Sequence, residues 1–209
     1  MKALVCALSL VLIMVSVVKA GTALEFTPKE MLDWSHRSLK GKSDYQLLES
    51  GKGIKAKAES SASGLFCEQE IDVKTMPWLS WRWRAVSFPD VQDEAAKEGD
   101  DFVLRLYVLV KPGWTMKSAK GVVYVWSSQE SPDESWPNPF ATDNIVTVPL
   151  RGRSEIGSWV DERRNVREDF KRYLGLDVNT VEVIAIMTDA DNGKSRAEGE
   201  YGRLQFAHE

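Results

Sequence analysis

The stretch Val181–Gly193, with the sequence VEVIAIMTDADNG, decides the fold class. Its first part, Val181–Thr188, consists mostly of β-branched and other apolar residues, which is typical of a buried strand. The run ends at Asp189, and the turn that follows presents a second carboxylate and an amide before a glycine. We therefore expect a buried strand with a polar loop at its end, and this loop is the first place to look for a ligand.

Short segments of strand character, separated by turn signals such as Lys111-Pro112-Gly113, occupy most of the remaining chain. Many short strands with a single helix are typical of a mainly β fold, an antiparallel β-sandwich or jelly roll. The predicted strands are Asp33–Leu39, Tyr45–Glu49, Gly53–Glu59, Leu65–Ile71, Trp78–Val86, Asp101–Val110, Gly121–Trp126, Ile145–Val148, Val181–Thr188 and Gly199–Phe206.

One α-helix is predicted, over about residues 158–174. Ser158 is a candidate N-cap with Asp161 at the capping-box position, and Gly175 can take the left-handed conformation that ends a helix. We expect this helix to cover one end or edge of the sandwich. Its apolar face consists of Trp159, Val166, Phe170, Tyr173 and Leu174.

The N-terminal segment has the composition of a secretory signal peptide. Lys2 precedes an apolar core from Ala3 to Val18, and Ala20 completes a small-residue cleavage signal. The apolar run is shorter than the ~20 residues that a membrane span needs. We therefore predict a signal peptide over residues 1–20, a single β-sandwich domain over residues 21–209, a periplasmic or secreted location, and no membrane span after cleavage.

Composition argues against several classes of protein. The formal net charge of −4 becomes −6 when Lys2 and Lys19 leave with the signal peptide, so the domain has no basic excess and nucleic acid is not an expected partner. Only Cys67 remains of the two cysteines, which leaves no internal disulfide. With His36 and His208 as the only histidines, a zinc cluster or a histidine-based nucleophilic triad is not expected either.

Strand alternation places arginines and aromatic residues opposite the apolar side chains. Arg82 and Arg84 alternate with apolar residues in one predicted strand, and Arg105 and Tyr107 do so in another. If the strands are neighbours, these side chains share one sheet face, with Arg203 and Gln205 from the last strand beside them. The alternative is an ordinary solvated face, on which each arginine pairs with an acidic residue.

A shared face of this kind could bind a ligand. Guanidinium groups bind carboxylates and sugar hydroxyls in fixed geometry, and aromatic rings stack on sugars. We predict non-catalytic binding of a saccharide or an anionic component of the cell envelope. The candidate ligand-binding residues are Arg82, Arg84, Arg105, Tyr107 and, as a stacking ring, Trp126.

The acidic turn is a candidate metal site. Asp189 and Asp191 offer oxygen donors two residues apart, which suits a hard cation such as calcium (Ca²⁺). The alternative is a turn whose side chains bond backbone N–H groups. No catalytic residue is assigned. An enzyme stays open as a carbohydrate-active hydrolase that uses Asp101 and Asp189, and this would require the two carboxyls to converge in a cleft.

A further alternative is an envelope assembly protein. The segment Ser127–Asp143 is too long for a plain hairpin loop and carries Trp136 and Phe140. Together with Trp114 these residues would have to form a broad exposed apolar patch, since such patches mark docking surfaces.

Ordered blocks of sequence across the chain carry a family resemblance. They are Trp81-Arg82-Trp83-Arg84, Gly99-Asp100-Asp101-Phe102, Arg105-Leu106-Tyr107-Val108, Tyr124-Val125-Trp126-Ser127, Trp159 with Glu162, Arg164-Asn165-Val166, Asp169-Phe170 and Ile184–Asn192. From about Trp34 to Phe206 the chain resembles the bacterial exported family called domain of unknown function 3047. The resemblance implies a periplasmic single domain with a jelly-roll fold similar to galactose-binding and carbohydrate-binding modules. It implies no activity, substrate or catalytic residue.

Overall fold

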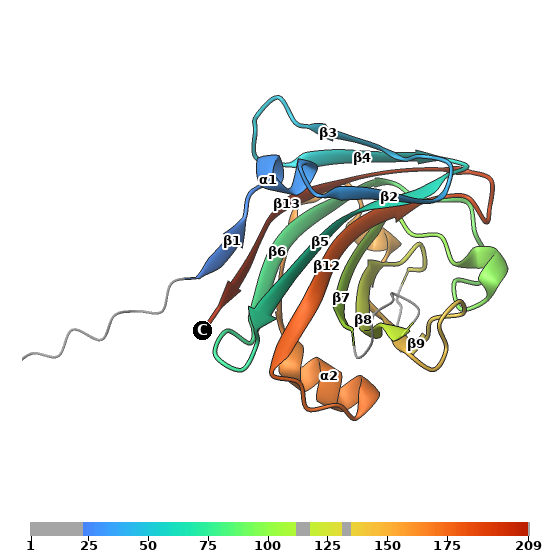
Figure 1. The fold of residues 1–209 in the computed structure, drawn as a ribbon. Helices are drawn as coiled ribbons and strands as arrows, with labels where there is room; N and C mark the ends of the chain where they lie inside the picture. The colour runs from blue at the N-terminus through green and yellow to red at the C-terminus, as the bar shows by residue number, and fades with distance from the viewer. Residues whose placement is uncertain (1–22, 112–117, 131–134, 209) are drawn as a thin grey trace, which may run out of the picture.

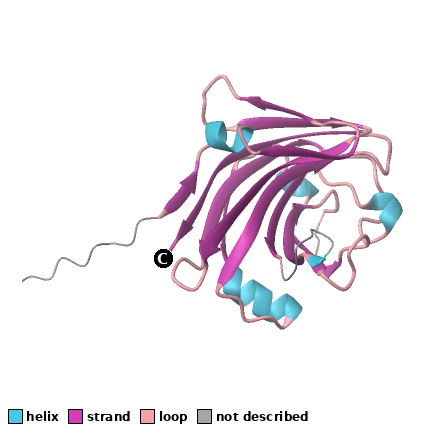
Figure 2. Ribbon diagram, viewed as in Figure 1, coloured by secondary structure: helices cyan, strands magenta, loops and turns pink. Residues whose placement is uncertain are grey.

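The computed structural model describes residues 23–111, 118–130 and 135–208. The predicted signal peptide and Trp114 lie outside the described residues. Strands dominate the described part, and they form two sheets that enclose a common apolar core (Figures 1 and 2). The predicted β-sandwich is therefore confirmed. Within the described residues, no helix is long and apolar enough to cross a membrane.

The first sheet is six-stranded, with the order β11-β6-β13-β4-β3 and with β1 paired to β13. Its strands alternate as the sequence predicts. Trp81 and Trp83 of β6 point into the core, whereas Arg82 and Arg84 point outward. The strands are β1 (Leu24–Phe26), β3 (Asp44–Leu47), β4 (Ile54–Glu59), β6 (Trp78–Ser87), β11 (Val160–Asn165) and β13 (Arg196–Ala207).

The second sheet is seven-stranded, with the order β2-β5-β12-β7-β8-β10-β9. β12 lies between β5 and β7 and is buried almost throughout, which explains the apolar run from Val183 to Met187. β8 and β10 pair in parallel, because the long connection between them allows a crossover that a hairpin would not. The strands are β2 (Ser35–Lys40), β5 (Ala62–Asp72), β7 (Leu104–Val110), β8 (Lys120–Trp126), β9 (Trp136–Pro137), β10 (Ile145–Arg151) and β12 (Thr180–Asp189).

An aromatic cluster fills the space between the sheets. The ring centroids of Trp81 and Trp83 are 5.3 Å apart with the planes at 88°, and Trp83 lies 5.9 Å from Trp126 of the opposite sheet. Tyr124 lies 5.3 Å from Trp81. Edge-on and tilted contacts of this kind stabilise the core beyond the burial of apolar area alone.

The helix α2 begins later than the sequence predicts. It spans Val166–Leu174, and its N-cap is Asn165, whose Oδ1 accepts a hydrogen bond from the Glu168 N–H at 3.2 Å. The predicted N-terminal part, residues 158–165, is wrong: most of it is the edge strand β11. The C-terminal end is confirmed, since Gly175 has φ +67°. α2 covers one end of the sandwich (Figure 1). The other helices within the described residues are α1 (Pro28–Leu32) and the 3-10 turns η1 (Lys97–Gly99) and η3 (Arg153–Glu155).

Candidate functional site

The predicted arginines lie on two different sheets. Arg82 and Arg84 belong to β6 of the six-stranded sheet, whereas Arg105 and Tyr107 belong to β7 of the seven-stranded sheet. Both pairs point away from the common core, so they lie on opposite faces of the sandwich. The expectation of one shared face is therefore wrong. The reason is that alternation within a strand identifies its outward side but not the sheet to which it belongs.

Arg105 is the centre of a buried ion cluster. Its Nε donates to Asp189 Oδ1 at 2.8 Å, its Nη2 lies 2.5 Å from Asp189 Oδ2, and its Nη1 lies 3.2 Å from Asp100 Oδ1. The side chain of Arg105 is 2% exposed, that of Asp189 is 3% exposed and that of Asp100 is 5% exposed. The cluster joins β7 and β12 to the loop before β7, so the fork-shaped guanidinium acts as an internal crosslink.

The cluster holds two carboxyls against one guanidinium, so it carries a net negative charge when both are ionised. Burial raises the pKa of Asp189 to about 7, although the neighbouring Arg105 opposes this shift. Burial also raises the pKa of Asp100. A proton taken up by one of the two carboxyls makes the cluster neutral.

Asp101 organises the acidic turn that follows β12. Its Oδ1 accepts hydrogen bonds from the N–H groups of Asp191 and Asn192, both at 3.1 Å, and its Oδ2 accepts one from the Gly193 N–H at 2.7 Å. A Cβ at position 193 would lie 2.6 Å from the carbonyl oxygen of Asp90, so glycine is required by close packing. The turn is thus held by a carboxylate from a distant part of the chain.

These contacts do not fit a calcium site. Carboxylate oxygens of Asp101, Asp189 and Asp191 lie within 4.8 Å of one another, as metal ligands would. However, both oxygens of Asp189 face Arg105, and both oxygens of Asp101 accept N–H groups. A cation there would have to displace a guanidinium and three donors, so the geometry favours the turn alternative.

The same contacts bear on the hydrolase alternative. Asp101 and Asp189 do converge, but both side chains are buried and their oxygens are occupied by internal donors. A general acid or base must reach a substrate atom within hydrogen-bond distance. In this arrangement neither carboxyl is available for that role.

A cavity of about 400 Å³ lies over the Arg105 cluster. Leu39 and Phe140 line it and are 72% and 61% exposed, which is unusual for large apolar side chains. Polar groups line it as well, among them the Tyr107 hydroxyl, the Asn192 amide and Lys40. Burial raises the pKa of Tyr107 to about 12, so its hydroxyl stays protonated and can donate. The arrangement combines apolar rims with a fixed polar floor.

The aromatic residue available to a ligand is not the one that the sequence predicts. Trp126 is fully buried, packs against Trp83 and donates its Nε1–H to the Gly152 carbonyl at 2.9 Å, so it is not available to stack on a ligand. Phe140 instead offers an exposed ring. The sequence drew attention to Phe140, because this residue lies in the long segment before β10, but it predicted Phe140 as part of an apolar patch and not as a ligand-binding ring.

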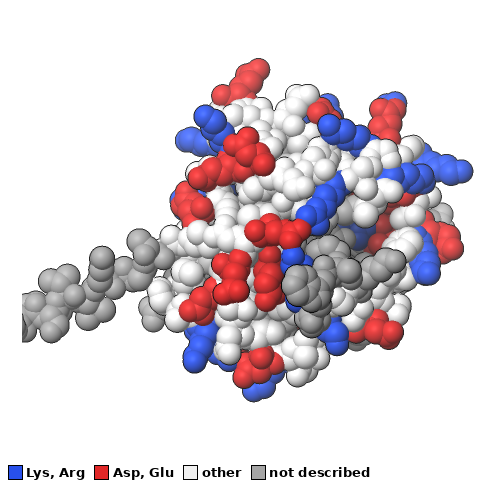
Figure 3. Space-filling view, viewed as in Figure 1, with Lys and Arg blue, Asp and Glu red and all other residues white. Residues whose placement is uncertain are grey.

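No broad apolar patch of the kind required for assembly is found among the described residues. Trp136 is partly buried and stacks on Phe102 with centroids 6.3 Å apart, so of the two described candidates only Phe140 is strongly exposed. Figure 3 shows acidic and basic side chains interspersed over the face in view.

A comparison with protein families assigns the chain. The family described as "Protein of unknown function (DUF3047)" matches residues 32–205. The chain belongs to this family. Among curated proteins, none matches the DUF3047 chain.

Solved structures with a similar architecture include carbohydrate-binding and carbohydrate-cleaving proteins. A low-affinity xylan-binding module from Roseburia intestinalis has 10% identity and a TM-score of 0.38, with 89% of this chain and 95% of that one covered. A thermostable cellulase derived from Cel12A of Rhodothermus marinus has 9% identity and a TM-score of 0.43, with 82% and 100% covered. The xyloglucanase domain of NopAA from Sinorhizobium fredii has 5% identity and a TM-score of 0.42, with 81% and 90% covered. These likenesses concern the sandwich architecture alone.

Proposed function

We propose that this protein is a periplasmic, non-catalytic binding protein that holds a neutral saccharide in the cavity over Arg105 and Tyr107. The observation that carries the proposal is the exposed ring of Phe140 at the rim of a cavity with a rigid polar floor. Aromatic rings beside fixed hydrogen-bonding groups are a common arrangement in small-molecule sites, and the volume lies in the usual range of ~300–1,000 Å³.

The charge of the cavity favours a neutral ligand over an anionic one. Arg105 is already matched by Asp100 and Asp189, and Lys40 contacts Asp191 at 3.4 Å. Acidic groups therefore equal or outnumber the basic ones, and a ligand carboxylate would meet no unpaired guanidinium here. Hydroxyl groups, which both donate and accept, suit the mixture of carboxylate, phenol and amide groups.

A glycan array followed by calorimetry with the best-binding neutral oligosaccharide tests the proposal. Phe140→Ala should weaken binding at least tenfold, and Tyr107→Phe should weaken it through the loss of one hydroxyl. Ile156→Ala is the matched control, since Ile156 is an exposed apolar residue that does not line the cavity. No binding to any neutral glycan, or equal affinities for Phe140→Ala and Ile156→Ala, would refute the proposal.

A further inference from the structure

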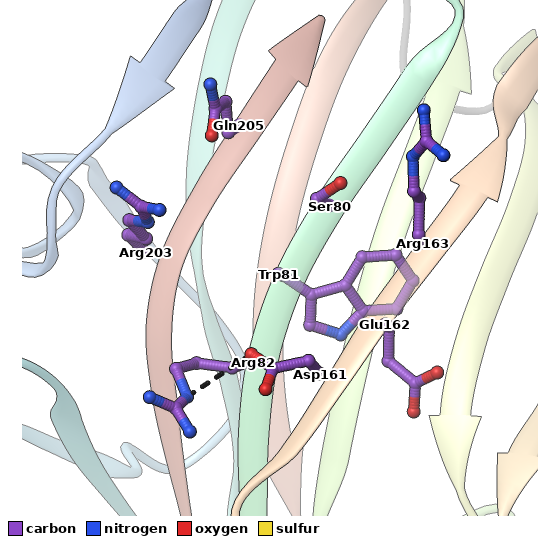
Figure 4. Close-up of a pocket in the computed structure, with 8 residues that line it drawn as sticks. All are labelled: Ser80, Trp81, Arg82, Asp161, Glu162, Arg163, Arg203 and Gln205. Carbon is purple, nitrogen blue, oxygen red and sulfur yellow. Dashed lines mark ion pairs between the residues drawn. The ribbon is translucent and has the colours of Figure 1, made fainter. Parts of the chain in front are cut away.

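The outer face of the six-stranded sheet contains a hollow centred on Ser80. In the strand register, Ser80 of β6 pairs with Arg163 of β11 on one side and with Gln205 of β13 on the other. Figure 4 shows Ser80 between these two side chains. Trp78 and Arg82 are its neighbours on the same face of β6. Because Ser80 is short and all four neighbours are long, the surface is sunken there, with a volume of about 270 Å³.

Three arginines line this hollow, and two of them form only weak ion pairs. Arg82 Nε lies 3.5 Å from Asp161 Oδ1, and Arg203 Nη1 lies 3.2 Å from Glu25 Oε2. Both pairs are exposed to solvent, where an ion pair contributes little and a ligand can replace the partner.

Arg163 is the third arginine of the hollow. Within the part of the chain that the structure describes, no carboxylate lies within ion-pair distance of its guanidinium, which instead rests 4.1 Å from the centroid of the Trp78 ring. A guanidinium held over an indole by a cation–π contact keeps its N–H groups available, and its planar fork suits a carboxylate.

Glu162 also contributes to the lining, but its charge is directed inward. Its Oε1 accepts hydrogen bonds from Trp83 Nε1 at 3.0 Å and Arg151 Nε at 2.6 Å, and its Oε2 accepts one from Arg151 Nη2 at 3.1 Å. The exposed charges of the hollow are therefore three guanidiniums against Asp161 and Glu25. The excess is positive, on a chain whose formal net charge is −4.

We propose that this hollow is a second site, on the opposite face from the saccharide cavity, that binds the carboxylate of a uronic-acid residue in an acidic polysaccharide. Arg163 holds the carboxylate and Arg203 adds positive charge on the other side of Ser80 (Figure 4), while the Ser80 hydroxyl and the Gln205 amide bond the sugar hydroxyls. The volume lies just below that of pockets for drug-sized ligands, so the hollow holds one sugar residue, and the open sheet face lets the polymer continue on both sides.

Calorimetric titration of the purified protein with oligogalacturonides tests this site. Arg163→Gln removes an exposed arginine with no ion pair, so the fold should be unaffected, and the Kd should rise about tenfold through the loss of a charged hydrogen bond. Arg196→Gln is the matched control: Arg196 is 77% exposed, lies at the other end of the sheet and pairs only with the exposed Glu59. It should leave the Kd unchanged.

Two ligand controls define the chemistry. Fully methyl-esterified oligogalacturonides lack the charge and should not bind, and inorganic phosphate should not compete at concentrations equal to the oligosaccharide. No binding of oligogalacturonides at millimolar concentration, equal binding of the esters, effective competition by phosphate, or equal losses in Arg163→Gln and Arg196→Gln would each overturn the proposal. Phe140→Ala should not change uronate binding, so failure at this site is distinguishable from failure of the neutral-saccharide cavity.

Discussion

Replacement of Arg105 by methionine separates a structural role of this guanidinium from a ligand-binding role. Methionine retains much of the length of the side chain but leaves Asp100 and Asp189, which are 5% and 3% exposed, without a counter-charge. Removal of one partner from a buried ion pair typically costs about 3–5 kcal/mol. We therefore expect the free energy of unfolding of Arg105→Met to fall by about 3–5 kcal/mol at pH 8.

The loss should be smaller at pH 5. Burial raises the pKa of both carboxyls even with Arg105 present, and the attraction of Arg105 is the main influence that opposes this shift. Without Arg105 both pKa values rise further, so at pH 5 the carboxyls take up protons and the buried charges disappear. At pH 8 the two carboxyls of the variant either stay charged without a partner or take up protons from a solution in which protons are scarce. Either outcome lowers the free energy of unfolding.

Urea unfolding at pH 5 and pH 8 measures both quantities. Arg196→Met is the control, because an exposed ion pair contributes only about 0–1 kcal/mol. If Arg105→Met lost no more stability at pH 8 than Arg196→Met, or lost more at pH 5 than at pH 8, the assignment of Arg105 as a buried structural crosslink would be refuted.

Three further measurements test other parts of the structure. The wild-type protein should become less stable as pH rises from about 4 to about 7. The reason is that folded Asp189 has a pKa of about 7 and an unfolded aspartate has one near 3.9, so the folded state binds the extra proton in this window. Asp189→Asn should flatten this pH dependence of the free energy of unfolding in urea, and an unchanged slope would contradict the raised pKa. In thermal unfolding, Asn165→Ala should lower the free energy of unfolding by about 1 kcal/mol, because it removes the N-cap of α2. Ser158→Ala should lower it by less than about 0.5 kcal/mol. The reverse order would indicate that the helix begins at residue 158. Calcium at millimolar concentration should leave the melting temperature unchanged; a rise that Asp191→Asn abolishes would establish a metal site, since a ligand of the folded state must raise stability.

The strand pattern was predictable because its cause is local. β12 is apolar on both faces, and its partners β5 and β7 cover it on both edges, so a sequence of β-branched residues suffices to identify it. The predicted strands all have counterparts in the structure. The short strands β1 and β9 and the helix α1 were missed, because two to five residues hold too little periodicity to detect.

The start of α2 was not predictable from a binary pattern. In β11 the inward positions include Glu162 and Arg164, and each has a partner outside the strand. Glu162 pairs with Arg151 of β10, and Arg164 pairs with Asp169 of α2. Charged residues at inward positions remove the alternating apolar pattern by which a strand is recognised, and the preceding Ser158 is a residue type typical of an N-cap. Only these partners, which belong to other elements of the fold, show that the two side chains point inward.

The candidate site was half predictable for the same reason. The sequence identifies the outward positions of β6 and β7, but it does not show which arginines are paired. Arg105 meets two carboxyls, whereas Arg163 meets no carboxylate among the residues that the structure describes. Pairing determines which arginine can bind a ligand, and pairing depends on register between strands that are distant in sequence. The acidic turn behaves likewise, since the carboxylate that orders it belongs to Asp101 and not to the turn itself.

The division of charge between the two outer faces predicts how ligands would behave together. The cavity at Phe140 contains carboxyls that match its cations, whereas the hollow at Ser80 has guanidiniums in excess. The two faces are separated by the common core, so they share no side chain that a ligand could reposition, and distant sites of this kind usually act independently. Saturation of one site should therefore leave the Kd of the other unchanged, and salt should weaken only uronate binding, because only that interaction depends on net charge. If a single oligosaccharide competed for both sites, or if salt weakened both to the same degree, the two faces could not carry the separate chemistries assigned to them.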